Sequence, residues 1–211
     1  MEKMQRILNY FDELYPSPVC ALNFTTPFEL LVAVMLSAQC TDKRVNIVTE
    51  HLFKIANTPE KLIELGEKNL KDIIFPCGFY NSKSKALIET SKDLLNKYNG
   101  NVPSTLEDLT SLRGVGRKTA NVVISVAFGG QTIAVDTHVH RVSKRLGLAK
   151  ENSTPLECEL SLLKKIPFNR RSKFHHQTIW FGRDICNAKN PKCECCKLKN
   201  ICKYYKKHKK L

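Results

Sequence analysis

Leu112-Arg-Gly-Val-Gly-Arg-Lys-Thr-Ala120 is the stretch that decides the fold, because it joins two segments of helical periodicity at about 105–112 and 117–128. Gly114 and Gly116 let the turn adopt backbone angles closed to other residues and let a phosphate come close. The free N–H groups that begin the second helix can hold that phosphate. A tight helix connection needs glycine in any case. A dinucleotide-binding fold is disfavoured because the strand expected before the turn is missing.

The rest of the chain also shows helical rather than strand periodicity, so the predicted fold class is all-α. Met4, Ile7, Leu8, Phe11 and Leu14 form an apolar stripe that stops before two prolines. Thr26-Pro27-Phe28-Glu29 supplies an N-cap, a first-turn proline and a capping-box glutamate before a buried helix that reaches Leu36. Further helices are predicted at about 42–55, 59–65, 67–75, 82–97, 137–146, 155–165 and 172–186.

Four cysteines near the C-terminus have the spacing C-x6-C-x2-C-x5-C: Cys186, Cys193, Cys196 and Cys202. Soft thiolates in one compact loop suit an iron–sulfur cluster or zinc. Zinc sites usually have two close Cys-x2-Cys pairs, and this loop has one, but both metals stay open at this point. Disulfides are disfavoured because the chain has 9 cysteines, an odd number, and no secretory signal. Cys195 falls outside the pattern.

The composition favours a polyanionic partner, since 34 basic and 20 acidic residues give a formal charge of +14. Nucleic acid is the first expectation and an anionic membrane surface the second. The longest apolar run, Phe28–Ala38, is about half the length that a membrane span requires. The expectation is an intracellular protein without a membrane segment. The basic end, Lys203–Leu211, could be a solvated tail.

Together these motifs resemble one known family. The segment Leu112–Ala120, Ala134-Val-Asp-Thr-His-Val-His-Arg141 and the four-cysteine loop occur in the order typical of endonuclease III, a helix-hairpin-helix DNA glycosylase. Leu36-Ser-Ala-Gln-Cys-Thr-Asp42 and Gly78-Phe-Tyr-Asn-Ser-Lys83 are further matches. The resemblance spans nearly the whole chain. It implies a 4Fe-4S cluster in place of zinc, bound by the four cysteines.

The resemblance also implies a reaction. Lys118 matches the nucleophile that displaces a damaged base and forms a Schiff base with the opened sugar, and Asp136 matches its carboxylate partner. Beta-elimination then cuts the strand on the 3′ side. Lys118 must be neutral to attack, through partial burial, a nearby cation such as Arg117, or a proton acceptor. Taken alone, Lys118 could be an exposed helical lysine and Asp136 a helix N-cap.

The implied substrate is double-stranded DNA that contains oxidised pyrimidines or abasic sites. Such an enzyme flips the nucleotide out and fills the gap. Gln39 and Phe79 occupy the filling positions, although core packing and helix capping are the alternatives. Phe79 stands where the family's bacterial members are expected to have leucine, and Arg113 stands where proline is common. The remaining implied DNA-binding residues are Lys83, Gly114, Val115, Gly116, Arg117 and Arg141, with Lys85 and Arg145 as further candidates.

The implied architecture is two helical domains with a DNA-binding cleft between them. A six-helix barrel spans about 20–130 and contains the helix-hairpin-helix at about 105–128, whereas 1–19 and 131–211 form the iron–sulfur cluster domain. We expect a monomer in the cytoplasm, associated with the nucleoid. His138 and His140 are expected to make local hydrogen bonds rather than to bind metal.

Two other functions compete with this interpretation. An adenine glycosylase shares the hairpin and the cluster, but it uses a glutamate in the early apolar helix, where this chain has Ala33. A non-catalytic basic DNA-binding module with a structural metal would not need Lys118. Both it and the enzyme would lose affinity as salt rises, so a covalent intermediate is the feature that separates them.

Overall fold

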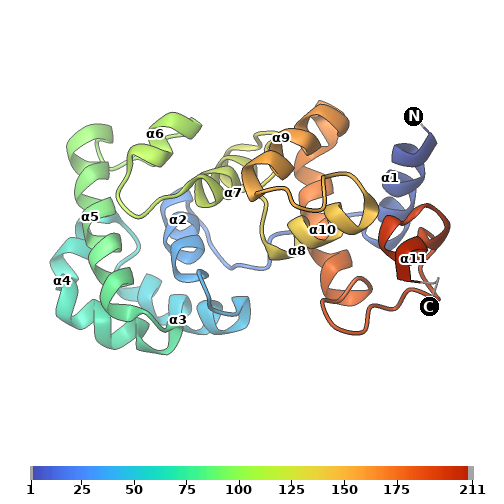
Figure 1. The fold of residues 1–211 in the computed structure, drawn as a ribbon. Coiled ribbons are helices and arrows are strands. Elements are labelled where there is room, and N and C mark those ends of the chain that lie inside the picture. The colour runs from blue at the N-terminus through green and yellow to red at the C-terminus, as the bar shows by residue number, and fades with distance from the viewer. Residues whose placement is uncertain (1, 209–211) are drawn as a thin grey trace. The chain divides into compact units, whose positions relative to one another are not determined.

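The computed structural model describes residues 2–208 of the protein, and every regular element in that range is helical (Figure 1). The predicted all-α class is therefore confirmed. The chain divides into two compact units. We call Cys20–Gly129 the hairpin unit, and Met1–Val19 with Gly130–Leu211 the cysteine-loop unit.

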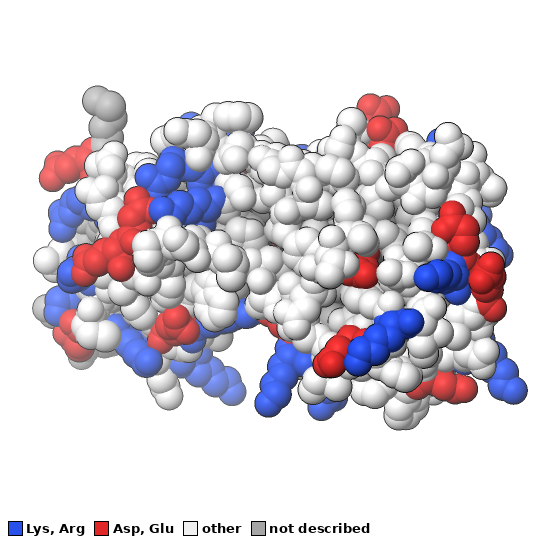
Figure 2. All heavy atoms as spheres, turned by 180° about the vertical axis from the view of Figure 1, so that it is seen from behind, with Lys and Arg blue, Asp and Glu red and all other residues white. Residues whose placement is uncertain are grey.

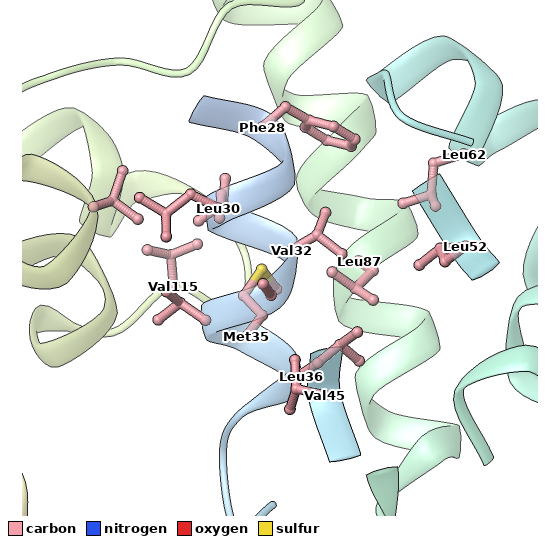
Figure 3. Packing of buried hydrophobic residues seen from close by; sticks show 14 of the residues in the cluster. Phe28, Leu30, Val32, Met35, Leu36, Val45, Leu52, Leu62, Leu87 and Val115 are labelled. Carbon is pink, nitrogen blue, oxygen red and sulfur yellow. The ribbon is translucent and has the colours of Figure 1, made fainter. Parts of the chain in front are cut away.

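The hairpin unit is built around α2, which is apolar on all sides and buried from Phe28 to Leu36 (Figure 3). Thr26 caps it, because its hydroxyl accepts the Glu29 N–H at 3.2 Å. Glu29 accepts from the N–H and hydroxyl of Thr25 rather than from Thr26, which modifies the predicted capping box. The helices of this unit are α2 (Pro27–Leu36), α3 (Asp42–Ile55), α4 (Pro59–Ile74), α5 (Tyr80–Tyr98), α6 (Leu106–Ser111) and α7 (Arg117–Phe128), with a 3-10 turn, η1 (Phe75–Cys77).

Helix α4 is interrupted at Gly66, whose φ of +77° lies in the left-handed region. Only glycine adopts this conformation at little cost. The interruption explains why the sequence predicted two helices, at 59–65 and 67–75, where one kinked element occurs.

The cysteine-loop unit joins the two ends of the chain. Phe11 of α1 is fully buried and stacks on Phe174 and Phe181 of α10, with ring centroids 5.7 and 5.0 Å away. Asp12 adds ion pairs to Arg170 at 2.7 Å and to Lys173 at 2.8 Å. The helices are α1 (Glu2–Leu14), α8 (Thr137–Leu146), α9 (Pro155–Lys165), α10 (Arg171–Asp184) and α11 (Lys203–His208), with 3-10 turns η2 (Phe168–Arg170) and η3 (Lys199–Ile201).

The sequence left a solvated tail as one interpretation of Lys203–Leu211, and the described part of that segment is helical. Lys203–His208 forms α11, and the Arg145 guanidinium of α8 lies 4.3 Å from the centre of the Tyr204 ring. Such a cation–π contact favours docking of this short helix on α8. Residues 209–211 of the predicted tail lie outside the described range.

Charges of both signs occur on the face seen in Figure 2, among many uncharged residues. Several lysines of the hairpin unit pair with a carboxylate one turn away, such as Lys71 with Glu67 at 2.8 Å and Lys97 with Asp93 at 3.2 Å. Part of the formal charge of +14 is thus locally balanced by neighbouring carboxylates. In residues 2–208, none of the helices has the length and apolarity needed to cross a membrane.

Replacing Phe11 by alanine should destabilise the cysteine-loop unit by about 3–5 kcal/mol, the usual cost of emptying a buried phenylalanine site. The single tryptophan, Trp180, lies on α10, so its fluorescence during urea unfolding reports on this unit. Phe168→Ala is the matched control because Phe168 is 67% exposed. Equal shifts of the two unfolding midpoints would contradict the role of Phe11.

Candidate active site and cysteine loop

The turn between α6 and α7 is anchored by its central residue. Val115 is buried, with its side chain among the apolar residues around α2 (Figure 3). Its N–H donates to the Leu112 carbonyl oxygen at 3.2 Å. The turn is therefore fixed to the core, and the side chain of Val115 is not available to a ligand.

The two glycines of the turn serve different purposes. Gly114 has a φ of +78°, and a Cβ there would lie 2.8 Å from the Ala86 Cβ, so both conformation and packing require glycine. Gly116 has a φ of −88°, and a Cβ there would meet no atom within 4 Å. Neither strain nor packing explains Gly116. It is the N-cap of α7 and has no side-chain cap, so the start of that helix has open space beside Gly116.

Arg113 departs from the family's proline, and its backbone is held from α5. The Thr90 hydroxyl donates to its carbonyl oxygen, and its N–H donates to the Asp93 carboxylate at 3.3 Å. Its guanidinium pairs with Glu89 at 3.1 Å. These contacts restrain the backbone at a position where proline is common, and they engage the guanidinium within the protein.

Lys118 is the second residue of α7 and is exposed. Partial burial, one of the three predicted ways to favour its neutral form, is therefore absent in this structure. Asp136 is the N-cap of α8, and its Oδ1 accepts the Val139 N–H at 2.7 Å. The predicted capping role of Asp136 is confirmed. Lys118 belongs to the hairpin unit and Asp136 to the cysteine-loop unit.

Gln39 and Phe79 share an unusual backbone. Their φ values are +55° and +50°, in the left-handed region that non-glycine residues rarely occupy. Both side chains are exposed, Phe79 by 62%. Phe79 is therefore not packed in the core. Gln39 caps neither neighbouring helix, because Ser37 is the C-cap of α2 and Thr41 the N-cap of α3.

Two predicted DNA contacts are instead engaged within the protein. Lys83 is buried, and its ammonium donates to the carbonyl oxygens of Leu36 at 2.8 Å and Cys77 at 3.0 Å. Burial lowers the pKa of Lys83. Arg141 donates to the carbonyl oxygens of Gly182 at 2.8 Å and Cys186 at 3.1 Å. Neither cation is presented to a phosphate in this arrangement.

The histidines of α8 make the local contacts that were expected. His140 Nε2 lies 2.8 Å from the Ser153 carbonyl oxygen, and His138 Nδ1 lies 3.2 Å from Arg141 Nη2. Burial lowers the pKa of His138, which outweighs the opposite effect of Asp136.

The four cysteines of the C-terminal loop line one pocket of about 340 Å³, part of it open to solvent. In the described range, no group of three or more His, Cys, Asp and Glu side chains is arranged to hold a single metal ion. Cys195 is exposed and does not line the pocket. A converging set of four thiols fits an iron–sulfur cluster. The lining includes Cys186, Cys193, Cys196, Cys202, Arg145, Leu146, Phe181, Ile185 and Tyr204.

Arginine side chains of α8 hold this loop in place. Arg145 donates to the Asn187 carbonyl oxygen at 2.6 Å, to the Ala188 carbonyl oxygen at 3.0 Å and to the Cys186 sulfur at 3.4 Å. Burial, with a smaller contribution from the neighbouring thiols, raises the pKa of Cys196 to about 11. A positively charged metal centre would offset that cost, because metal binding requires the thiolate.

Comparison with known proteins identifies the chain. Residues 32–168 match the HhH-GPD superfamily of base excision DNA repair proteins. The chain is 46% identical over 209 residues to endonuclease III of Haemophilus influenzae, with 98% of this chain and 99% of the relative covered. The chain belongs to the endonuclease III family. The Escherichia coli K12 endonuclease III is 45% identical over 209 residues, with the same coverage of both chains.

Solved structures of endonuclease III agree with this. A trapped endonuclease III–DNA covalent intermediate superposes with a TM-score of 0.93 at 46% identity, covering 97% of each chain. A non-covalent endonuclease III–DNA complex gives 0.95 at 44% identity, covering 100% of this chain and 98% of the other. As a member of the endonuclease III family, the chain is a DNA glycosylase with abasic-site lyase activity, and its family carries an iron–sulfur cluster.

Sequence reasoning missed Thr90 and Asp93, and it gave Lys83 a different role, as a DNA contact. All three residues belong to α5 and hold the ends of other segments through backbone atoms. Backbone acceptors leave no pattern in a sequence. Arg141 and Arg145 did carry a signal, because residues four apart on a helix share one face, but the loop they bind could not be known.

The two glycines of the hairpin should respond differently to alanine. Gly114→Ala should lower the free energy of unfolding by about 1–3 kcal/mol, from left-handed strain and overpacking. Gly116→Ala should unfold like the wild type yet bind an abasic-site duplex more weakly, because a methyl group would stand where a phosphate approaches. Urea unfolding and fluorescence anisotropy measure the two effects. Unchanged DNA affinity in Gly116→Ala would count against phosphate binding by this turn.

Proposed function

We propose that this enzyme removes oxidised pyrimidines from duplex DNA and cleaves the resulting abasic site, with Lys118 as the nucleophile. The observation that carries the proposal is the position of Lys118: it is exposed on the first turn of α7, two residues beyond Gly116, beside which the start of the helix has open space. A phosphate held there would bring a sugar within reach of an amine.

The reaction uses the amine in two steps. Neutral Lys118 Nζ attacks the sugar C1′, and the bond to the damaged base breaks, with the electron pair leaving on the base. The sugar ring then opens to a Schiff base, which acidifies C2′. Loss of the C2′ proton expels the 3′ phosphate by beta-elimination. An amine can form this covalent intermediate, and a water nucleophile cannot.

Asp136 is the proposed carboxylate partner. Its Oδ1 is engaged at the start of α8, which fixes the orientation of the carboxylate. A fixed carboxylate can accept a proton from the attacking amine and stabilise positive charge that builds up on the sugar. The predicted cleft between the two domains belongs to this proposal.

Gln39 and Phe79 are the proposed residues that fill the gap left by the flipped nucleotide. Exposed side chains on strained backbone are typical of functional sites, and an exposed aromatic ring can stack between bases. The turn that would contact the DNA backbone consists of Gly114, Val115, Gly116 and Arg117. Val115 anchors this turn in the core. Lys83 and Arg141 would support the DNA-binding segments from within the protein.

Cys186, Cys193, Cys196 and Cys202 are the proposed ligands of a 4Fe-4S cluster. The cluster would tie the loop together through iron–thiolate bonds and take no part in the reaction. Lys197 and Lys199 of the loop pair with Glu13 and Glu194, whereas Lys189 and Lys192 are exposed and could face a phosphate. A monomer in the cytoplasm, associated with the nucleoid, completes the proposal.

Borohydride should trap the wild type on a duplex with one thymine glycol and on an abasic duplex, and Lys118→Gln should give no trapped complex on either. Gel mobility after denaturation measures the covalent product. Lys54→Gln is the matched control, since Lys54 is an exposed helical lysine paired with Glu50. Absence of trapping by the wild type on both duplexes would leave a monofunctional glycosylase or a binding module.

Arg145→Met should weaken the hold of the cysteine loop on its metal, because four backbone and sulfur acceptors lose their donor. The expected result is faster loss of visible absorbance and of iron when the protein is incubated with a chelator. Lys144→Met on the same helix is the control. Equal rates of iron loss would show that Arg145 is dispensable.

A further inference from the structure

Two cysteines outside the C-terminal loop lie on neighbouring segments of the hairpin unit. Cys40 ends the turn that follows α2, and its N–H donates to the Ser37 carbonyl oxygen at 3.1 Å. Cys77 ends η1 and is 2% exposed. Cys40 is close enough to Cys77 to contribute to the raised pKa of the Cys77 thiol. They are 37 positions apart in sequence, so the fold creates this pair.

The backbone on both sides of the pair is bound together. Lys83 bridges the Leu36 and Cys77 carbonyl oxygens at 2.8 and 3.0 Å. Arg44 of α3 donates to the Pro76 carbonyl oxygen at 3.4 Å. A disulfide requires close Cβ atoms and little backbone movement. These three bonds limit how far the two segments can move apart.

Each thiol is next to a proposed gap-filling residue. Cys40 directly follows Gln39, and Cys77 precedes Phe79 by two residues. A bond between the two sulfurs would therefore join the segments that present both side chains. Because both residues already occupy left-handed backbone, additional restraint on either segment would limit how the side chains adjust to DNA.

We propose that Cys40 and Cys77 form a reversible disulfide on exposure to peroxide, and that this disulfide weakens binding of damaged DNA. The second part rests on the proposed roles of Gln39 and Phe79, whereas the first does not. Cytosolic disulfides are usually transient and redox-sensing, and two neighbouring thiols beside the proposed gap-filling residues fit that use.

The chemistry assigns different roles to the two thiols. Cys40 is partly exposed, so its sulfur meets peroxide first, giving a sulfenic acid and one water. The Cys77 sulfur then attacks the Cys40 sulfur, forms the S–S bond and releases the second water. Two electrons pass from the thiols to the peroxide. Burial, together with the neighbouring Cys40, raises the pKa of Cys77 to about 11, which suits a resolving thiol rather than the first nucleophile.

The test is peptide mapping of the full-length, metal-containing protein after limited hydrogen peroxide treatment and alkylation without reductant. The expected result is a Cys40–Cys77 cross-linked peptide, two hydrogens lighter than the two free peptides, that disappears on treatment with dithiothreitol. Cys195→Ser is the matched control and should keep the cross-link, whereas Cys40→Ser should lose it. Alkylated or over-oxidised Cys40 without any cross-link would overturn the proposed site.

Binding to a duplex with a non-cleavable abasic analogue tests the consequence. Oxidation should lower the affinity of the wild type several-fold, dithiothreitol should restore it, and the affinity of Cys40→Ser should not change. Unchanged visible absorbance confirms that the C-terminal loop is intact. A cross-link without loss of affinity would refute the effect on DNA binding. Trapping through Lys118 is measured separately, so failure of the proposed reaction is distinguishable from failure of this inference.

Discussion

The hairpin unit depends on one constraint: α2 is apolar on every side, so it must be enclosed on every side. An all-round apolar helix is stable only in the interior of a protein, and α3, α5 and α7 all pack against it (Figure 3). The Met35 side chain, near the end of α2, lies beside Gly114: a Cβ at Gly114 would lie 3.2 Å from the Met35 Cε. The turn that holds the proposed phosphate site and the turn that carries Gln39 are thus both attached to the same buried helix. Packing around α2 therefore fixes the positions of both turns at the surface.

The cysteine-loop unit depends instead on hydrogen bonds from side chains to its loop. Its loop has little regular structure, so its carbonyl oxygens need donors from elsewhere. The guanidiniums of α8 supply them, with Arg141 and Arg145 on the same face of one helix. A guanidinium has five N–H donors in a fixed geometry and can serve several carbonyl oxygens at once. Because Arg141 and Arg145 are bonded to the loop, their charges do not face DNA, although they count toward the formal charge.

The helices could be predicted from the sequence because their signals are local. The helices predicted at 137–146 and 155–165 are α8 and α9, which are bounded by local signals: Gly147 is the C-cap of α8, and Thr154 and Glu157 form a capping box at the start of α9. The roles of basic side chains could not be predicted, because a lysine on a helix gives no indication of its acceptor. Lys83 was expected to contact DNA and is instead bonded to two backbone carbonyl oxygens. The proximity of Cys40 to Cys77 is likewise a product of long-range packing.

The position of α1 has a consequence for synthesis. The hairpin unit is one continuous stretch of chain, so all its parts have left the ribosome once Gly129 has been added and exited. The core of the other unit needs Phe11 together with Phe174 and Phe181, and these contacts span most of the chain. Domains fold as units during synthesis, in the order in which they are completed. Helix α1 is synthesised before the hairpin unit and its aromatic partners on α10 after it, so α1 lacks these partners until α10 has emerged. The core of the cysteine-loop unit can close only then.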